Sequence, residues 1–121
     1  MAIFDKSDTS SNTTLIAIGT KLDGEFELKC KLHIDGEVSG RIDSDSIVSI
    51  GKGGIFSGEL QANKLIISGV FEGNAKCDSI ELLQGGKILG SIVSGDLMVE
   101  SGSILEGECQ IKKDSQFEKN G

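Results

Sequence analysis

The chain has 121 residues, of which 37% are apolar, enough to line one modest core and too few for a second folded domain. Seventeen glycines without any proline exclude collagen, and an aromatic content of 4% disfavours stacking grooves for sugars or single-stranded nucleic acid. Twelve lysine and arginine residues against nineteen carboxylates give a net charge of −7, which makes nucleic acid an improbable partner.

A short apolar tip opens the chain, formed by Met1, Ala2, Ile3 and Phe4. It leads into a polar stretch, and residues 1–13 are therefore predicted to be a flexible tail. Burial of Ile3 and Phe4 in a bilayer interface contributes about 3–5 kcal/mol to membrane binding, before the cost of ordering the tail is subtracted. This binding is weak for one molecule. Wherever copies of the chain assemble, several such tips bind together, so we expect these four residues to contact a membrane. No apolar run is long enough to span a bilayer or to form a signal peptide.

Glycines recur after the tail at intervals of 15–18 residues and in one sequence context. Each has an apolar residue two positions before it and another two positions after it, with mostly polar residues directly beside it. The six glycines are Gly24, Gly40, Gly58, Gly73, Gly90 and Gly107. An alternating apolar pair precedes each of them, and Ile16 and Ile18 are expected to form this pair in the first unit. The period of two predicts β-strands throughout, because a helix needs 3.6 residues per turn.

Units of about 17 residues cannot each enclose a core, so they must stack. Stacking in register, with strands about 4.8 Å apart, gives an all-β parallel β-helix (β-solenoid) of about six coils over residues 14–111. Gly51–Gly54, Leu83–Gly86 and Glu100–Ser103 add two residues each and are expected to form corners. The uneven spacing disfavours the left-handed hexapeptide β-helix and favours right-handed winding. Residues 112–121 are mostly polar and are predicted to be a second flexible tail.

The first and last coils of an open solenoid leave apolar columns and backbone groups unpaired. Neither tail carries apolar residues at helical spacing that would cap them. We therefore expect copies of the chain to stack end to end. The predicted interface at the N-terminal end is formed by Ile16, Ile18, Leu22 and Phe26. The predicted interface at the C-terminal end is formed by Val99, Leu105, Cys109 and Ile111.

Motifs for catalysis, cofactors and metals are absent from the sequence. Gly51–Gly54 lacks the spacing of a nucleotide-binding P-loop, and the three cysteines lack metal or redox spacing and indicate a reduced, cytoplasmic protein. His33, the one histidine, lies between the inward Leu32 and Ile34 and is expected to face solvent. No enzyme and no catalytic, cofactor or metal site are predicted. The alternative function is a trimeric, left-handed hexapeptide-type acyltransferase with His33 as its base.

Two units carry a resemblance to a known family, Leu32–Gly40 (LHIDGEVSG) and Asn63–Gly73 (NKLIISGVFEG). With this pattern, the chain resembles the bactofilins over about residues 14–111. The resemblance implies a right-handed β-helix of the bacterial cytoskeleton that polymerises end to end without nucleotide. It also implies a peripheral position on the inner face of the cytoplasmic membrane and a role in organising cell-wall enzymes and cell shape. Like ends are expected to meet, which gives nonpolar filaments.

Overall fold

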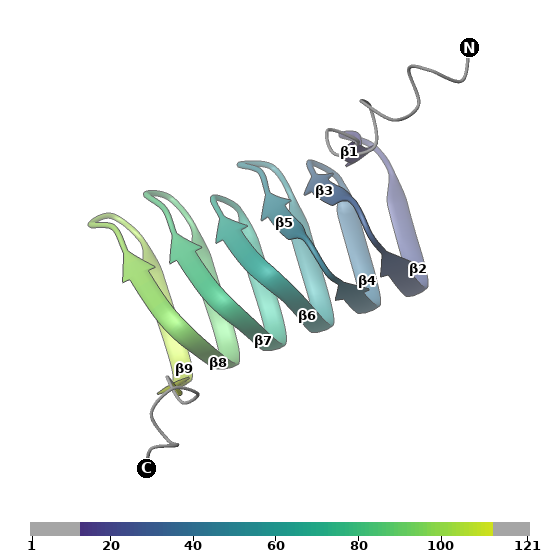
Figure 1. Ribbon diagram of the computed structural model, residues 1–121. Helices are drawn as coiled ribbons and strands as arrows, with labels where there is room; N and C mark the ends of the chain where they lie inside the picture. Colours follow the sequence, from purple (N-terminus) through teal and green to yellow (C-terminus); the bar gives the residue numbers. More distant parts are fainter. Residues whose placement is uncertain (1–12, 113–121) are drawn as a thin grey trace.

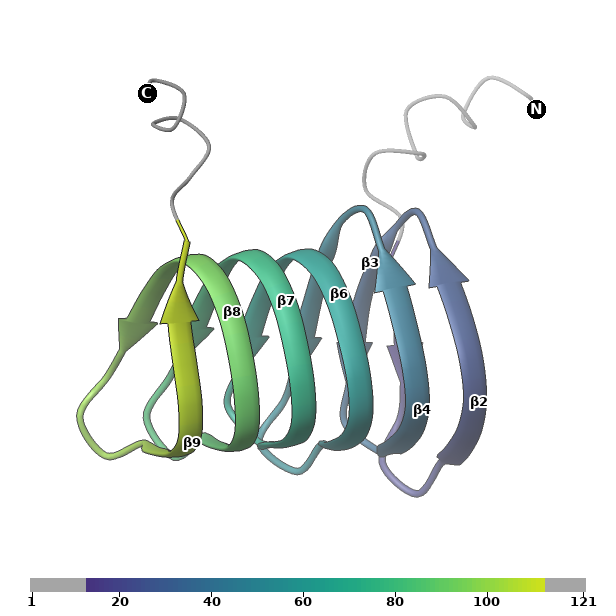
Figure 2. The same ribbon diagram turned by 90° about the horizontal axis from the view of Figure 1, so that it is seen from below.

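A computed structural model of the chain describes residues 13–112, which form one parallel β-sheet wound into a solenoid of about six turns (Figure 1). The strands are β1 (Thr13–Ile16), β2 (Lys21–Leu28), β3 (Lys31–Ile34), β4 (Glu37–Ser44), β5 (Ile47–Ile50), β6 (Ile55–Ile67), β7 (Val70–Leu82), β8 (Lys87–Val99) and β9 (Ile104–Ile111). Figure 2 shows the coils following one another along the rod, with the first and last coils at opposite ends. The predicted all-β parallel solenoid is confirmed, and its right-handed winding stays a prediction. The predicted tails lie outside the described residues, apart from Thr13 and Lys112.

The register of the sheet aligns the six recurring glycines from coil to coil. Gly24 of β2 pairs with Gly40 of β4, and Gly40 pairs with Gly58 of β6. The column then continues through Gly73 and Gly90 to Gly107. The columns two positions before and two positions after these glycines match in the same way. The register predicted from the glycine spacing is therefore confirmed pair by pair.

These glycines are required because successive coils approach each other closely at this column. Gly73 has a φ of +133°, and a Cβ added to it would overlap the carbonyl oxygen of Gly58 in the preceding coil. Gly58 stands in the same relation to Gly40. A side chain at any internal position of the column would therefore force neighbouring backbones apart.

The first coil differs from the prediction in the placement of its apolar pair. The sequence pattern assigned Ile16 and Ile18 to the columns of Leu32 and Ile34, whereas Thr14 and Ile16 occupy them. The reason is a corner from Ala17 to Thr20, closed by a hydrogen bond from the Thr20 amide to the Ala17 carbonyl at 3.1 Å. The same closure occurs at Gly51–Gly54 and Leu83–Gly86, so the first coil also has the longer corner.

The core is a set of apolar columns along the axis of the rod. Phe56 and Phe71 are fully buried and stack on each other, with ring centroids 5.6 Å apart and planes 15° apart. Two serines interrupt an otherwise apolar or small column and are also buried. Ser44 accepts a hydrogen bond from the Ser46 amide at 3.0 Å, and the Ser94 hydroxyl donates to the backbone of Asp96. Both buried hydroxyls therefore have the partners that burial requires.

Candidate functional site

Large exposed apolar side chains occur in the first and last coils of the described chain. They are Leu15, Ile18, Leu22, Met98, Val99, Ile104 and Ile111. The coils between them bury the equivalent inward columns almost completely. Within residues 13–112, the inward columns are therefore uncovered at both ends of the solenoid.

The C-terminal end is formed by β9 and the end of β8. Leu105 and Cys109 continue the columns of Ile88 and Ile92, which are buried one coil earlier. Cys109 itself is exposed, and Ile111 keeps 46% of its surface accessible. Cys109 therefore lies in an inward column without being a core residue of the single subunit, because no further coil among the described residues covers this column.

The N-terminal end is formed by β1 and β2. Leu22 continues the column of Val38 but is 36% exposed, whereas Val38 is 2% exposed. Phe26 is partly buried and packs against the core. Ile16 is already buried within the subunit, and Ile18 lies on the corner with 81% of its surface exposed. Leu22 and Phe26 are therefore the predicted residues that present an open inward column.

The terminal strands also have one free edge each. Among residues 13–112, β9 pairs with β8 alone, β1 with β3 alone and β2 with β4 alone. A parallel strand that is paired on one side only has N–H and C=O groups along its other edge that can form hydrogen bonds with another strand. The exposed columns and the free edges lie on the same coils, so each end offers both apolar and hydrogen-bonding contacts.

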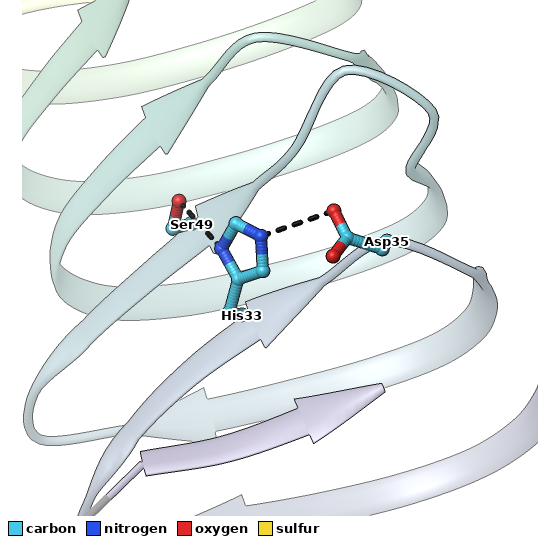
Figure 3. Close-up of polar contacts among 3 residues, drawn as sticks. All are labelled: His33, Asp35 and Ser49. Carbon is cyan, nitrogen blue, oxygen red and sulfur yellow. Dashed lines mark hydrogen bonds and ion pairs between the residues drawn. The ribbon is translucent and has the colours of Figure 1, made fainter. Parts of the chain in front are cut away.

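His33 lies on the outer face of β3, as predicted, within a small polar cluster (Figure 3). With its proton on Nε2, the ring donates to Asp35 Oδ1 at 3.0 Å and accepts from the Ser49 hydroxyl at Nδ1 at 3.2 Å. A Cβ at Gly51 would overlap the Asp35 carboxylate. The cluster therefore fastens the second coil to the third and depends on a glycine in the adjoining corner.

The His33 cluster contains the residue types of a nucleophilic triad, but its three side chains do not line one common groove of the described pockets over residues 13–112. Asp35 lines a groove of about 340 Å³ beside Ile18 and Lys21, and neither His33 nor Ser49 lines it. Substrate sites are concave and surround most of the ligand. Ser49 also lies within β5 in a continuous parallel ladder. The cluster is best explained as a structural contact between coils.

The three cysteines have different environments. Cys77 is buried, and desolvation raises the pKa of its thiol to about 12. Cys30 is partly buried, with its Sγ 3.4 Å from the Thr14 hydroxyl, while Cys109 is exposed. A thiol with a raised pKa is a poor nucleophile because the thiolate is the reactive form. Cys77 therefore acts as a small core residue, and Cys109 is accessible at the C-terminal end.

Within residues 13–112, no group of three or more His, Cys, Asp or Glu side chains is arranged to hold a metal ion. Over the same residues, none of the secondary structure is a helix long and apolar enough to cross a membrane.

Three outward apolar residues at the ends were missed by the sequence analysis. Leu15 and Met98 share the outward column that contains His33, and Ile104 extends the outward column of Lys87. The signal that could have found them is their position directly beside an inward residue of the repeat. These side chains belong to outward columns, which the apolar repeat does not include.

Comparisons with known proteins agree with this architecture. The family model described as "Bactofilin: Polymer-forming cytoskeletal" matches residues 14–110. The fold is similar to the cryo-EM reconstruction of Thermus thermophilus bactofilin double helical filaments, with a TM-score of 0.72 and 17% sequence identity. That match covers 82% of this chain and 99% of the other. A search of curated proteins found no match. The family match spans most of the solenoid, and the chain belongs to the bactofilin family of polymer-forming cytoskeletal proteins.

Proposed function

We propose that this chain assembles end to end into filaments without nucleotide and that these filaments lie on the inner face of the cytoplasmic membrane. The observation that supports assembly is that residues of the same inward column are buried in the middle coils and exposed in the end coils. Val38 and Ile92 are buried, whereas Leu22 and Cys109, which continue their columns, are exposed. Stacking another coil on either end completes the columns. The structural role of the family replaces the acyltransferase alternative with His33 as base.

Assembly without nucleotide hydrolysis requires the contacts at the ends to outweigh the free-energy cost of association. A fully buried aliphatic or aromatic side chain contributes about 1.5–3 kcal/mol, so half-exposed residues such as Leu22 and Ile111 contribute roughly 1 kcal/mol each when covered. Each new backbone hydrogen bond along a free edge adds about 0.5–1.5 kcal/mol. These terms oppose an association cost of about 4–15 kcal/mol. Several contacts along one whole coil are therefore needed, and an end-on coil contact provides them.

Purified protein should form filaments in negative stain and should pellet in the absence of ATP and GTP. Cys109 gives a second readout, because stacking at the C-terminal end covers it. We expect a thiol reagent to label Cys109 in dispersed subunits and to label it several-fold less in filaments. Cys77 serves as the internal control, since its buried thiol with a raised pKa should stay unlabelled in both states. Discrete subunits without filaments would contradict the assembly proposal.

The membrane part of the proposal depends on Met1, Ala2, Ile3 and Phe4, which lie outside the described residues. Its support is the apolar character of this tip and the number of tips that one filament presents. A weak interfacial anchor becomes a firm one when many copies bind together, because each further tip binds at high effective concentration. From the family resemblance we further propose that the bound filament scaffolds cell-wall enzymes and thereby contributes to cell shape.

Deletion of residues 1–4 should remove filaments from membranes without dissolving them. We expect co-sedimentation with liposomes to fall at least tenfold, because each filament loses all of its apolar tips. The control is the length and yield of the filaments that the deletion variant forms without liposomes, which should match those of the full chain. Liposome binding that survives the deletion would remove the tether from the proposal and leave the assembly proposal standing.

A further inference from the structure

The last part of β8, Asp96–Val99, has one edge that β9 does not cover. These residues pair with Ser79–Leu82 of β7 on one side, and within residues 13–112 no strand pairs with their other side. Val99 is 48% exposed, although Leu82 of the preceding coil, in the same inward column, is fully buried. This part of the last coil is therefore open, with backbone groups that lack a strand partner beside an uncovered apolar column.

The chain that follows β9 is directed along this open edge. The Lys112 amide donates a hydrogen bond to the Ser94 carbonyl at 2.8 Å, which extends the pairing of β9 with β8 by one residue. Nine residues come next, 113–121, with the sequence KDSQFEKNG. A strand that continues in this register runs along Asp96–Val99, and the residues after it reach the corner Glu100–Ser103. The segment therefore has the length needed to cover both.

The nine residues contain one large apolar side chain, Phe117, which comes two positions after a small one, Ser115. This alternation fits the two inward columns that end at Leu97 and Val99. The first column contains Thr14, Leu32, Val48, Leu65, Ile80 and Leu97, and the second contains Ile16, Ile34, Ile50, Ile67, Leu82 and Val99. Ser115 would follow Leu97 as a small hydroxyl residue, like Thr14 at the other end of the column, and Phe117 would cover Val99.

The step from one wall of the coil to the next permits this placement. Val48 comes four residues after Ser44, the last inward residue of the wall before it, and the same step from Ile111 reaches Ser115. The next three coils use a step of three residues, and that step would turn Asp114 inward. A carboxylate without a partner in an apolar column is unfavourable, so the longer step is the favoured one.

The last four of the nine residues match the long corners of the solenoid. These corners are Ala17–Thr20, Gly51–Gly54, Leu83–Gly86 and Glu100–Ser103, and each directly follows the second inward column. Their third residue is glycine in every case, and φ is +92° at Gly19, +86° at Gly85 and +89° at Gly102. Glu118–Gly121 has Asn120 in the third position, and asparagine is one of the few residues besides glycine that adopt a positive φ. The segment therefore carries both the strand and the corner of a further coil.

We propose that residues 113–121, in place of the flexible tail that their composition predicts, bind the open edge of β8 as the first half of a further coil. The amide that begins each corner donates to the coil before it, as the Glu100 amide does to the Leu82 carbonyl at 2.9 Å. In the same register the Glu118 amide donates to the Val99 carbonyl. Val99 is then covered within its own subunit rather than by a second copy. The inward residues of β9 stay available for end-to-end assembly, on which this binding does not depend.

A disulfide trap tests this register in the full chain. In the proposed placement Met98 and Gln116 point outward side by side. Adjacent parallel strands are about 4.8 Å apart, within the Cα separation of about 4.4–6.8 Å that a disulfide spans. With oxidised glutathione as oxidant, Met98→Cys combined with Gln116→Cys should give at least fivefold more intrachain disulfide than Met98→Cys combined with Ser115→Cys. The second pair is the matched control, because its thiol at position 115 would point into the coil.

The yields of the two cysteine pairs decide the register independently of filament formation. Replacement of Cys30 and Cys109 by alanine in both variants leaves the buried Cys77 as the one native thiol. Non-reducing electrophoresis identifies an intrachain disulfide at the mass of a single chain, so contacts between copies do not contribute. Equal yields from the two pairs, or a higher yield from the pair with Ser115→Cys, would overturn the placement whether or not filaments form.

Hydrogen exchange gives a second measurement with other variants, at a dilution at which no protein pellets. The backbone amides of residues 113–121 should be protected in the unmodified chain, because they are paired with β8. Phe117→Ser should raise their exchange rate at least tenfold, since the side chain that covers Val99 is removed. Gln116→Ser is the matched control, because it shortens the outward neighbour and should leave the exchange rate unchanged.

Asn120 tests the corner separately from the strand. Asn120→Val should raise the exchange rate of the segment as Phe117→Ser does, because a β-branched residue strongly disfavours a positive φ. Asn120→Gly should keep the protection, since glycine occupies this position in the other long corners. Amides of residues 113–121 that exchange in the unmodified chain as fast as those of an unstructured peptide would overturn the proposal. Protection that is equal in all of these variants would also overturn it, and neither result would alter the case for end-to-end assembly.

Discussion

Replacement of Gly73 by alanine should lower the free energy of unfolding by roughly 3–5 kcal/mol, through a φ of +133° that alanine disfavours and through overpacking. The new Cβ would overlap the carbonyl oxygen of Gly58, and a backbone atom in a continuous ladder cannot rotate away as a side chain can. Relief therefore requires the third and fourth coils to separate. Since small domains are stable by about 5–15 kcal/mol, this single methyl group should remove much of that margin.

Gly24 provides the matched control for this prediction. It heads the same column with a φ of +156°, yet an added Cβ would have the Phe26 ring, at 4.0 Å, as its nearest neighbour. Gly24→Ala therefore introduces an unfavourable φ without an overlap. Thermal unfolding followed by circular dichroism should show a melting temperature lower by on the order of 15 °C for Gly73→Ala and a much smaller decrease for Gly24→Ala. Equal decreases in the two variants would show that the close approach of neighbouring coils is not the reason why glycine is required in this column.

The register of the solenoid was predictable because the same glycine-centred pattern occurs in six units of the sequence. Each glycine context repeats the same alternation, so the columns through Gly40 and Gly58 could be aligned without a structure. The first coil was misaligned because its corner, Ala17–Thr20, contains one glycine, while the Gly51–Gly54 corner contains three. Thr14, a polar residue in an apolar column, weakened the signal further. A single irregular unit at an end has no following repeat to correct it.

The sequence predicted that inward columns end in the first and last coils. It did not predict how far each residue of these coils is buried. Alternation identified Leu22 and Ile111 as inward, and both are exposed where the columns end. Burial of Ile16 depends on the neighbouring coil, which a pattern cannot measure. The partners of His33 were missed for a similar reason: Ser49 comes from the next coil and was brought beside the ring by stacking. The sequence repeat predicts which residues of neighbouring coils are paired. Which of their side chains touch can be worked out only after that pairing is known.

Replacement of Ile111 by glutamate should dissolve filaments into small, folded species. In the assembled state this carboxylate would be buried in an apolar column without a partner, which costs several kcal/mol, whereas in the single subunit the position is 46% exposed. We expect the pelleted fraction to fall at least tenfold while the β-type circular dichroism spectrum is kept. Gln110→Glu is the matched control, because Gln110 lies in the outward column of Val93 and its new charge would stay in water.

The size of the released species shows which ends meet. If like ends meet, Ile111→Glu breaks the contact between C-terminal ends and leaves dimers joined at their N-terminal ends, with twice the chain mass of 12.7 kDa by light scattering. Adding Leu22→Glu should then convert these dimers into monomers, because Leu22 presents the open column at the other end. If unlike ends meet, every contact contains one Ile111, so the single change alone yields monomers. Filaments that persist with Ile111→Glu would place the contact away from this coil, since a column completed by a neighbour cannot hold an unpaired charge.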